Sequence, residues 1–197
     1  MYKYNLNDVE CGDLFIYDLF NLVRGNATDL SKRSLQELSK DSYAVISAKD
    51  QNNALLGFSK LKNGEVVYKN VITVNNNGSV GYSFYHAYTF IASSDVSVLI
   101  PKCDIDPAAM IFITRCLQNV AIEKFAYGYK AANDRLRKTK ILLPIDQNNN
   151  PNWEYMDNFI DELDKKYSIQ LSHYFNLKLD DIMGSENSKN LRGGGNL

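Results

Sequence analysis

The sequence contains few of the residues from which catalytic and metal sites are built, with only two histidines and three cysteines in 197 residues. Cys11, Cys103 and Cys116 are an odd number without close spacing, so neither a zinc site nor a disulfide framework is expected. Neither His86 nor His173 belongs to a His-x-x-x-His or His-Glu-x-x-His pattern. We therefore expect no metal centre, and thiols that are reduced and mostly buried.

Sequence motifs of the common enzyme classes are also missing. There is no Gly-x-Ser-x-Gly, no P-loop lysine motif and no Gly-x-Gly-x-x-Gly after a strand. The pair Asp180-Asp181 lies in an acidic helical stretch, where solvation explains it better than a two-metal nuclease site does. We expect no catalytic residue and no cofactor in this chain.

Long apolar runs are absent as well. Because no run of about eighteen apolar residues occurs, no segment is expected to span a membrane. The N-terminal sequence MYKYNLNDVECGDLF lacks the apolar core of a signal peptide, which predicts a cytoplasmic protein. The length, with 45% hydrophobic and 23% charged residues, fits one globular domain with an appended helix.

The charges that are present are unevenly distributed. The formal net charge is −1, which by itself argues against a general nucleic-acid binder. From Lys124 to Lys140, however, six bases and one acid give +5. From Asp146 to Asp181, eight acids and three bases give −5. A nearly neutral chain therefore contains a basic segment followed directly by an acidic one.

The apolar pattern predicts an α+β fold: a mixed twisted β-sheet with a few helices and a C-terminal amphipathic helix. Strands are predicted where β-branched and aromatic residues concentrate, at 43–48, 64–70, 71–75, 79–93, 96–101 and 140–145. Helices are predicted at 108–125, from 153 to about 171, and as a turn or two at 31–38. Asp106-Pro107 supplies the N-cap and first residue of the first of these helices. The stretch 13–24 is either a short strand or a helical turn before Gly25-Asn26.

The same pattern divides the chain into three parts. Residues 1–150 form the main domain, and 151–183 form a C-terminal helix suited to dimer or subunit contacts. Residues 184–197, GSENSKNLRGGGNL, are expected to be disordered because they are polar and rich in glycine.

Candidate DNA contacts are basic or amide residues that flank predicted strands. Arginine and lysine neutralise phosphates, while asparagine and arginine can also bind base edges through two hydrogen bonds. In the basic segment the candidates are Lys130, Asn133, Arg135, Arg137 and Lys138. In two earlier loops they are Arg24, Lys32 and Arg33, then Lys60 and Lys62. Each basic run, taken alone, is more typical of a solvated charged turn than of a DNA contact.

The C-terminal helix carries one narrow apolar stripe. Its members are spaced 4, 3, 4, 4 and 3 residues apart: Met156, Ile160, Leu163, Tyr167, Leu171 and Tyr174. Most amphipathic helices use such a stripe to cover the core of their own domain. A seam of about two apolar positions in seven is more typical of helix pairing with a partner. Both interpretations remain open.

The stretch 127–160, YGYKAANDRLRKTKILLPIDQNNNPNWEYMDNFI, resembles the end of a known kind of domain. It is similar to the target-recognition domain of specificity (S) subunits of type I restriction-modification systems and of BcgI-like recognition subunits. SVGYSFYHAYTFIASSDVSVLIPK and DLFNLVRGNATD are similar to earlier blocks of that domain. The resemblance extends over about residues 12–172. It is carried in the first stretch by Gly128, Lys130, Arg135, Leu136, Ile141, Leu143, Pro144, Pro151, Trp153, Met156 and Ile160.

This resemblance implies a subunit that recognises double-stranded DNA and has no chemistry of its own. It would bind one half of a bipartite target and direct methyltransferase and nuclease subunits there. S-adenosylmethionine, and ATP with magnesium in restriction, would belong to those partners. Specificity subunits usually hold two such domains, so this chain would be a half-subunit that forms a homodimer through its C-terminal helix, or a fragment. The alternative is a protein-interaction or scaffold module that uses the helix without sequence-specific DNA binding.

Overall fold

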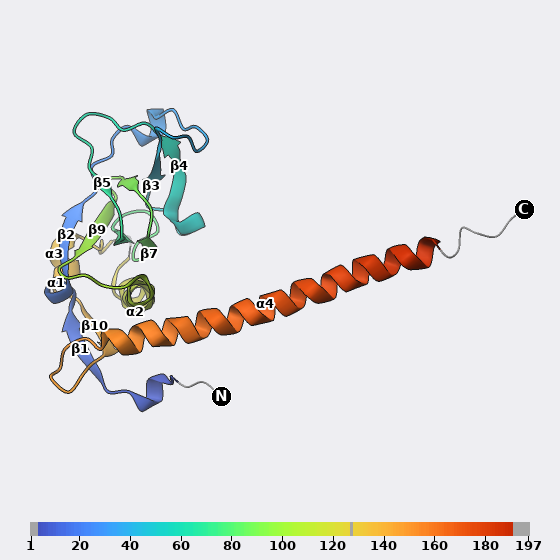
Figure 1. Ribbon diagram of the computed structural model, residues 1–197. Helices are drawn as coiled ribbons and strands as arrows, with labels where there is room; N and C mark the ends of the chain where they lie inside the picture. The colour runs from blue at the N-terminus through green and yellow to red at the C-terminus, as the bar shows by residue number, and fades with distance from the viewer. Residues whose placement is uncertain (1–3, 127, 191–197) are drawn as a thin grey trace, which may run out of the picture.

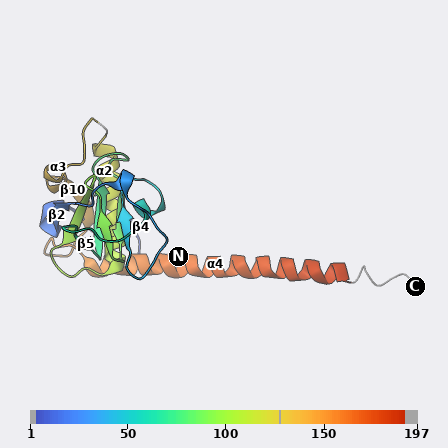
Figure 2. The same cartoon turned by 90° about the horizontal axis from the view of Figure 1, so that it is seen from above.

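The structure is a computed structural model that describes residues 4–126 and 128–190, with backbone alone at residue 173 and from residue 175 onward. Strands and short helices are gathered into one domain, and a single long helix projects far beyond it (Figure 1). The view from above confirms that this helix leaves the domain rather than folding back (Figure 2).

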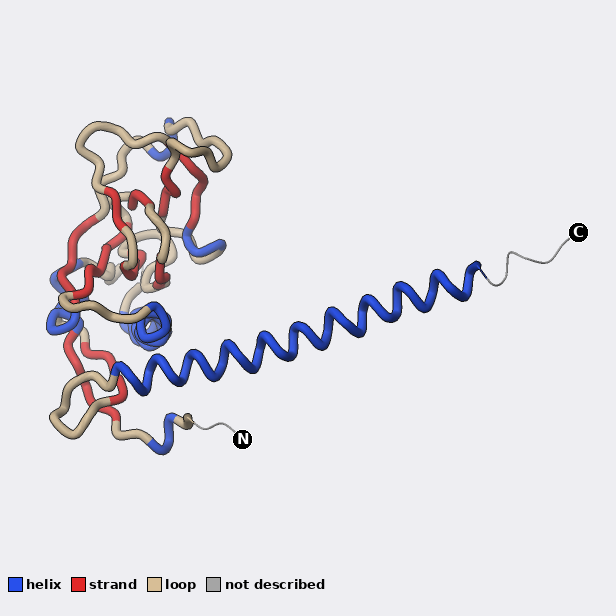
Figure 3. The backbone as a smooth tube through the Cα atoms, in the orientation of Figure 1, coloured by secondary structure: helices blue, strands red, loops and turns tan. Residues whose placement is uncertain are grey.

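Short strands dominate the first part of the chain and long helices the second (Figure 3). The strands are β1 (Cys11–Phe15), β2 (Phe20–Arg24), β3 (Tyr43–Ile46), β4 (Leu55–Ser59), β5 (Val67–Tyr68), β6 (Val71–Asn75), β7 (Ser83–His86), β8 (Phe90–Ala92), β9 (Val96–Pro101) and β10 (Lys140–Pro144). The α-helices are α1 (Ile16–Leu19), α2 (Pro107–Lys124), α3 (Asn133–Arg137) and α4 (Trp153–Asn190). Single 3₁₀ turns are η1 (Leu6–Asp8), η2 (Leu30–Lys32) and η3 (Asn52–Ala54).

The strands form two four-stranded sheets and one two-stranded ladder. One sheet has the order β2-β9-β6-β7 and is antiparallel throughout. The other, β4-β3-β8-β5, is mixed, because β3 and β8 run parallel. The ladder joins β1 to β10, which brings the start of the domain beside the strand that follows the basic segment. The α+β fold class is therefore confirmed, with the strands divided among three sheets instead of one.

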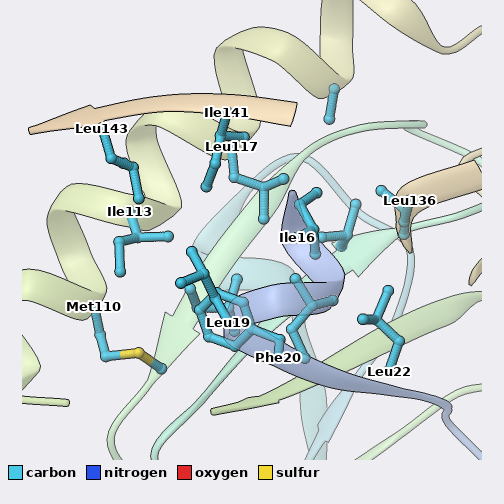
Figure 4. Packing of buried hydrophobic residues seen from close by; sticks show 14 of the residues in the cluster. Ile16, Leu19, Phe20, Leu22, Met110, Ile113, Leu117, Leu136, Ile141 and Leu143 are labelled. Carbon is cyan, nitrogen blue, oxygen red and sulfur yellow. The ribbon is translucent and has the colours of Figure 1, made fainter. Parts of the chain in front are cut away.

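The main core lies between the antiparallel sheet and α2 (Figure 4). Ile113 and Leu117 of α2 meet Phe20 of β2 there, and all three side chains are almost fully buried. Ile141 of β10 and Met156 of α4 close the same cluster. A second core, which includes Ile46, Phe90 and Val98, fills the space between the two four-stranded sheets. The first cluster has nineteen buried residues against nine in the second, and six of the nineteen belong to α2.

Several strand boundaries differ from those predicted. The stretch 79–93 is not one strand but β7 and β8, which belong to different sheets. Aromatic and β-branched residues favour a strand both before and after the point where the chain passes from one sheet to the other. Composition therefore cannot show where β7 ends and β8 begins. The prediction at 64–70 reduces to Val67–Tyr68, and β4 was not predicted. Strand β4 contains a glycine and forms through its antiparallel pairing with β3.

The helical turn predicted at 31–38 is also wrong beyond its first residues. The chain forms only the 3₁₀ turn Leu30–Lys32 and then runs extended. The N–H of Gln36 donates to the Phe58 carbonyl at 2.9 Å, so this segment pairs with β4 instead of continuing as a helix. A tertiary contact has overridden a weak local preference.

Helix α2 begins at Pro107 with Asp106 at the N-cap, as predicted, but the Asp106 side chain makes no capping hydrogen bond. Oδ1 of Asp157, on α4, accepts from the Ala109 N–H at 2.7 Å instead. Burial raises the pKa of the Asp157 carboxyl. Phe112 and Phe159 add an edge-to-face contact between the same two helices, with centroids 5.5 Å apart. The first turns of α4 are therefore attached to the start of α2 by the hydrogen bond from Ala109 to Asp157 and by the contact between Phe112 and Phe159.

Helix α4 continues to Asn190, well past the end predicted near residue 171. Residues 184–190, expected to be disordered, are helical; residues 191–197 lie outside the described part of the chain. Extending an existing helix adds one hydrogen bond per residue fixed and needs no new nucleation, which explains continuation through a polar stretch.

The three cysteines are free. Cys103 is exposed, and Cys11 and Cys116 are only partly buried, so the expectation of mostly buried thiols is wrong. Cys103 lies in the loop between β9 and α2, outside both cores. Burial raises the pKa of the Cys116 thiol to about 11.

Candidate nucleic-acid interface

The site begins at one end of the antiparallel sheet. Strand β2 ends at Arg24 opposite Ser97, and β6 ends at Asn75 opposite Val96, where β9 starts. The loops that leave these strands therefore emerge at the same edge, and they place Arg24, Asn76 and Asp95 close together.

Gly25 allows this convergence. A Cβ atom at this position would lie 2.2 Å from the Ser93 carbonyl oxygen, so the backbones approach too closely for any other residue. The Gly25 N–H donates to the Val96 carbonyl at 2.9 Å. Immediately before it, Nε of Arg24 donates to the Ser94 carbonyl. The end of β2 is therefore locked against the turn that precedes β9.

The basic segment is attached to the same sheet. Its short helix α3 places Leu136 in the main core with no exposed surface. Nη2 of Arg137 donates to the Leu22 carbonyl of β2 at 3.1 Å. Just after α3, Oγ1 of the buried Thr139 donates to the Arg135 carbonyl at 2.9 Å. The buried Leu136 and the bond from Arg137 to Leu22 thus hold the segment against the sheet.

Aromatic rings support the exposed side of this segment. The Arg135 guanidinium lies 4.0 Å from the centroid of the Tyr129 ring, which stacks on Phe125 at 5.8 Å. Nη1 of Arg135 also donates to the Lys130 carbonyl at 3.0 Å. Cation–π contacts of this kind contribute about 0.5–1 kcal/mol at exposed sites. Arg135 is therefore held in a defined orientation although its side chain reaches solvent.

Three of the predicted DNA contacts line one cleft of about 310 Å³: Arg24, Lys130 and Asn133. Asn76, Asp95 and Ala132 complete its walls. The other predicted members of the basic segment, Arg135, Arg137 and Lys138, are exposed on or next to α3. The structure therefore brings Arg24 together with the basic segment, although more than a hundred residues separate them in sequence.

Arg137 is partly engaged within the domain. Besides its bond to β2, its guanidinium lies 3.6 Å from the Asp134 carboxylate, and about half of the Arg137 side chain is exposed. A surface ion pair with such an exposed carboxylate contributes little and yields readily to a stronger anion.

The remaining candidates lie in a second hollow of about 350 Å³ beside the mixed sheet. Lys32 is the last residue of η2, and Lys60 and Lys62 lie in the loop after β4. Lys62 pairs with Asp29 at 3.2 Å on the exposed surface. These lysines are separate from the cleft at the end of the antiparallel sheet.

Arg33 is buried instead of exposed, so the structure contradicts the prediction that it contacts DNA. Its side chain is 1% exposed and forms an ion pair with Glu65, which is 3% exposed. Its guanidinium also donates to Ser59 Oγ at 3.3 Å. Burial raises the pKa of Glu65, but the Lys62 and Thr28 N–H groups and Arg33 outweigh it and lower the pKa overall. The sequence could not reveal this role, because the partner carboxylate is 32 residues away in the chain.

The apolar stripe of α4 is divided between two environments. Met156 is fully buried in the main core, and Ile160 packs against it. Leu163 lines a groove with Phe159 and the N-terminal segment 4–8. Farther along, Tyr167, Leu171 and Tyr174 are 61%, 55% and 53% exposed. The helix therefore covers its own domain over its first turns and presents an apolar stripe to solvent beyond them.

Three residues of the cleft region were missed by sequence reasoning. Asn76 and Asp95 lie in two separate turns between strands, and no local signal in the sequence indicates that these two turns meet. Tyr129 could have been noticed, since an aromatic residue beside a basic run often supports nucleic-acid binding. Within residues 4–126 and 128–190, no group of three His, Cys, Asp or Glu could hold a metal ion. No helix in this part is long and apolar enough to cross a membrane.

A basic segment backed by aromatic rings, beside a cleft of amide and charged side chains, is typical of nucleic-acid-binding domains, here one of α+β architecture. Comparison with known sequences then identifies the family. The chain belongs to the family of type I restriction modification DNA specificity domains, whose sequence profile matches residues 9–173. The resemblance to specificity subunits is thereby confirmed.

A curated relative is the specificity subunit S.BcgI of the type II restriction enzyme BgcI from Heyndrickxia coagulans. It is 30% identical over an alignment of 173 residues, and the match covers 83% of this chain and 48% of the relative. The chain thus spans about half the length of the curated relative that it matches.

Solved structures show the same fold. The S subunit of a type I restriction-modification system from M. genitalium superposes with a TM-score of 0.58 at 19% identity, covering 91% of this chain and 46% of that one. The HsdS subunit from Thermoanaerobacter tengcongensis gives 0.55 at 9% identity, covering 84% and 41%. A chain from a structural study of type I system assembly and conformational transition gives 0.56 at 10% identity, covering 91% and 46%.

Proposed function

We propose that this chain recognises a specific sequence in double-stranded DNA and directs partner methyltransferase and nuclease subunits to it. The observation that carries the proposal is the cleft at the end of the antiparallel sheet, where Arg24 meets Lys130 and Asn133. Cations and an amide at one edge combine phosphate contacts, which set position, with groups able to bind base edges.

The charge distribution supports the same proposal. The +5 segment from Lys124 to Lys140 is attached to the sheet beside the cleft, so its field is concentrated on one surface. Each phosphate that a basic side chain neutralises releases counterions, so affinity falls steeply as salt rises. The net charge of −1 does not oppose this, because the −5 stretch from Asp146 to Asp181, in α4 and the turn before it, offsets the basic segment in the total.

Helix α4 is the candidate for assembly. Its exposed stripe, Tyr167, Leu171 and Tyr174, lies on the part that projects beyond the domain. We infer that a second recognition domain and a methyltransferase subunit bind along this helix, with a second copy of this chain as one way to supply the other domain. In that arrangement this chain is non-catalytic and cytoplasmic. S-adenosylmethionine, and ATP with magnesium for restriction, are bound by the partner subunits.

The test is selection from a random DNA duplex library, with the full chain alone and together with its modification subunit. One duplex motif should be enriched, and its binding should weaken steeply with salt. The double variant Arg135→Glu and Arg137→Glu should abolish enrichment.

A matched control carries the same charge change elsewhere. Lys40→Glu with Lys69→Glu reverses two exposed lysines that lie outside both the cleft and α4, and it should retain enrichment. Thermal melting checks that every variant folds. Equal weak binding of all duplexes by the assembled complex would overturn the proposal and favour a protein-interaction module that works through the helix alone.

A further inference from the structure

We propose that Asp95 and Asn133 form a base-reading site that accepts the exocyclic amine of adenine or cytosine in the major groove. This inference rests on the proposed DNA recognition and adds the chemical class of base that the cleft selects.

Asp95 is unusual for its place in the molecule. It is the acidic member among the residues that line the cleft, where Arg24 and Lys130 supply positive charge. Within the described residues 4–126 and 128–190, its carboxylate forms no ion pair with either cation. Nε of Arg24 donates instead to the Ser94 carbonyl. A carboxylate without an ion pair, in a cleft that two cations also line, keeps acceptor capacity available.

Three hydrogen bonds hold Asp95 in position. Its N–H donates to Ser93 Oγ at 3.3 Å, and its carbonyl accepts from the Asn76 N–H at 2.9 Å. Oδ1 accepts from Asn77 Nδ2 at 3.2 Å. These contacts tie the turn before β9 to the loop after β6, so the carboxylate does not depend on DNA for its orientation.

The chemistry of DNA limits what such a carboxylate can contact. Phosphates are anionic and repel it, so phosphate binding at this cleft falls to the neighbouring cations. In the major groove, hydrogen-bond donors are the N4 amine of cytosine and the N6 amine of adenine. Guanine O6 and thymine O4 are acceptors and would face the carboxylate with like partial charge. Asp95 therefore favours two bases and disfavours the other two.

Asn133 supplies a second acceptor at the same place. Its Oδ1 is buried and has no hydrogen-bond partner among the described residues. A buried acceptor without a donor is destabilising, and rotation of the amide toward the cleft would relieve it. An asparagine amide can accept from adenine N6 while donating to N7. With the Asn133 amide rotated in this way, the cleft would present a second acceptor beside Asp95, which would strengthen the preference for a base that carries an amine.

The test measures binding to every single-base substitution of the selected duplex, with the full chain and its modification subunit. For the wild type, at least one position should prefer adenine or cytosine over guanine and thymine. Asp95→Ala should reduce that preference about tenfold or more, which is the discrimination expected of one good base contact. Affinity for unrelated duplexes should stay the same or rise, because a negative charge near phosphates has been removed.

A second variant separates base reading from support of the turn. Asp95→Asn keeps the size of the side chain and an oxygen for Asn77, but its amide can donate, so preference at that position should shift toward guanine or thymine. Unchanged preferences in Asp95→Ala, or a uniform loss at all positions in both variants, would overturn the assignment. A wild-type complex with no preference at any position would instead refute the proposed function itself.

Discussion

The buried pair of Arg33 and Glu65 allows a direct test of whether a basic residue serves the fold or the DNA. We consider three variants: Arg33→Met, Glu65→Leu, and both together. Each single change leaves one charge in a site where the side chains are 1% and 3% exposed. Breaking a buried pair from one side costs about 3–5 kcal/mol, while replacing both members with apolar groups is often neutral or stabilising.

The surroundings refine these magnitudes. After Arg33→Met, the Glu65 carboxylate still accepts from the Lys62 and Thr28 N–H groups at 2.9 and 3.2 Å. The loss should therefore fall near the lower limit, about 3 kcal/mol. At about 2–4 °C per kcal/mol for a chain of this size, the melting temperature should fall by about 10 °C. The double variant should melt within a few degrees of the wild type.

Thermal melting followed by circular dichroism gives the stabilities, and the duplex assay gives DNA affinity below the melting temperature. The folded double variant should bind DNA as the wild type does, because Arg33 does not reach the surface. Selective loss of DNA binding by a stably folded double variant would refute the structural assignment of Arg33. An Arg33→Met variant that melts like the wild type would refute the claim that the pair is buried.

Three further predictions concern stability. Burial lowers the pKa of His86 from 6.5 to about 4, so the folded state resists protonation. The free energy of unfolding should fall by up to about 3 kcal/mol as pH drops from 6.5 to 4. Urea unfolding at several pH values measures this, and an identical pH profile for His86→Gln would contradict it. Asp157→Ala should lower the free energy of unfolding by about 1 kcal/mol, because the Ala109 N–H loses its acceptor, and Asp157→Asn should lower it less. Equal melting temperatures for the wild type and the alanine variant would disprove the cap. Gly25→Ala should lower the free energy of unfolding by at least about 3 kcal/mol, because its Cβ would collide with the Ser93 carbonyl. A melting curve like that of the wild type would count against this close approach.

Local features of the fold could be predicted from the sequence. Helix α2 starts at the Asp106-Pro107 signal, and β10 ends at Pro144, as the residues themselves indicate. The capping bond at α2, however, comes from Asp157 on another helix, 48 residues from the N–H that it accepts from. Start and stop signals are local, but the partners that satisfy a helix end need not be.

In the candidate site, too, some features could be predicted from the sequence and others depended on tertiary contacts. The basic segment was recognisable as a run of charges, and five of its residues remain candidates on one surface. Lys32, Lys60 and Lys62 have equally basic neighbours but lie in a separate hollow. Arg33 is buried beside Glu65. Charge is a property of each residue, whereas exposure depends on which distant segments pack over it.

By itself, the sequence determined the family, the α+β class, the separation of a +5 segment from a −5 segment, and the periodic stripe of α4. The tertiary structure decided that this stripe is buried at Met156 and exposed at Tyr167 and beyond, because the domain lies under only the first turns of the helix. It also decided that Arg24 and Asp95 meet the basic segment in one cleft. Periodicity and charge arise from neighbours in the chain, while a cleft arises from strand register and loop packing between residues far apart in it.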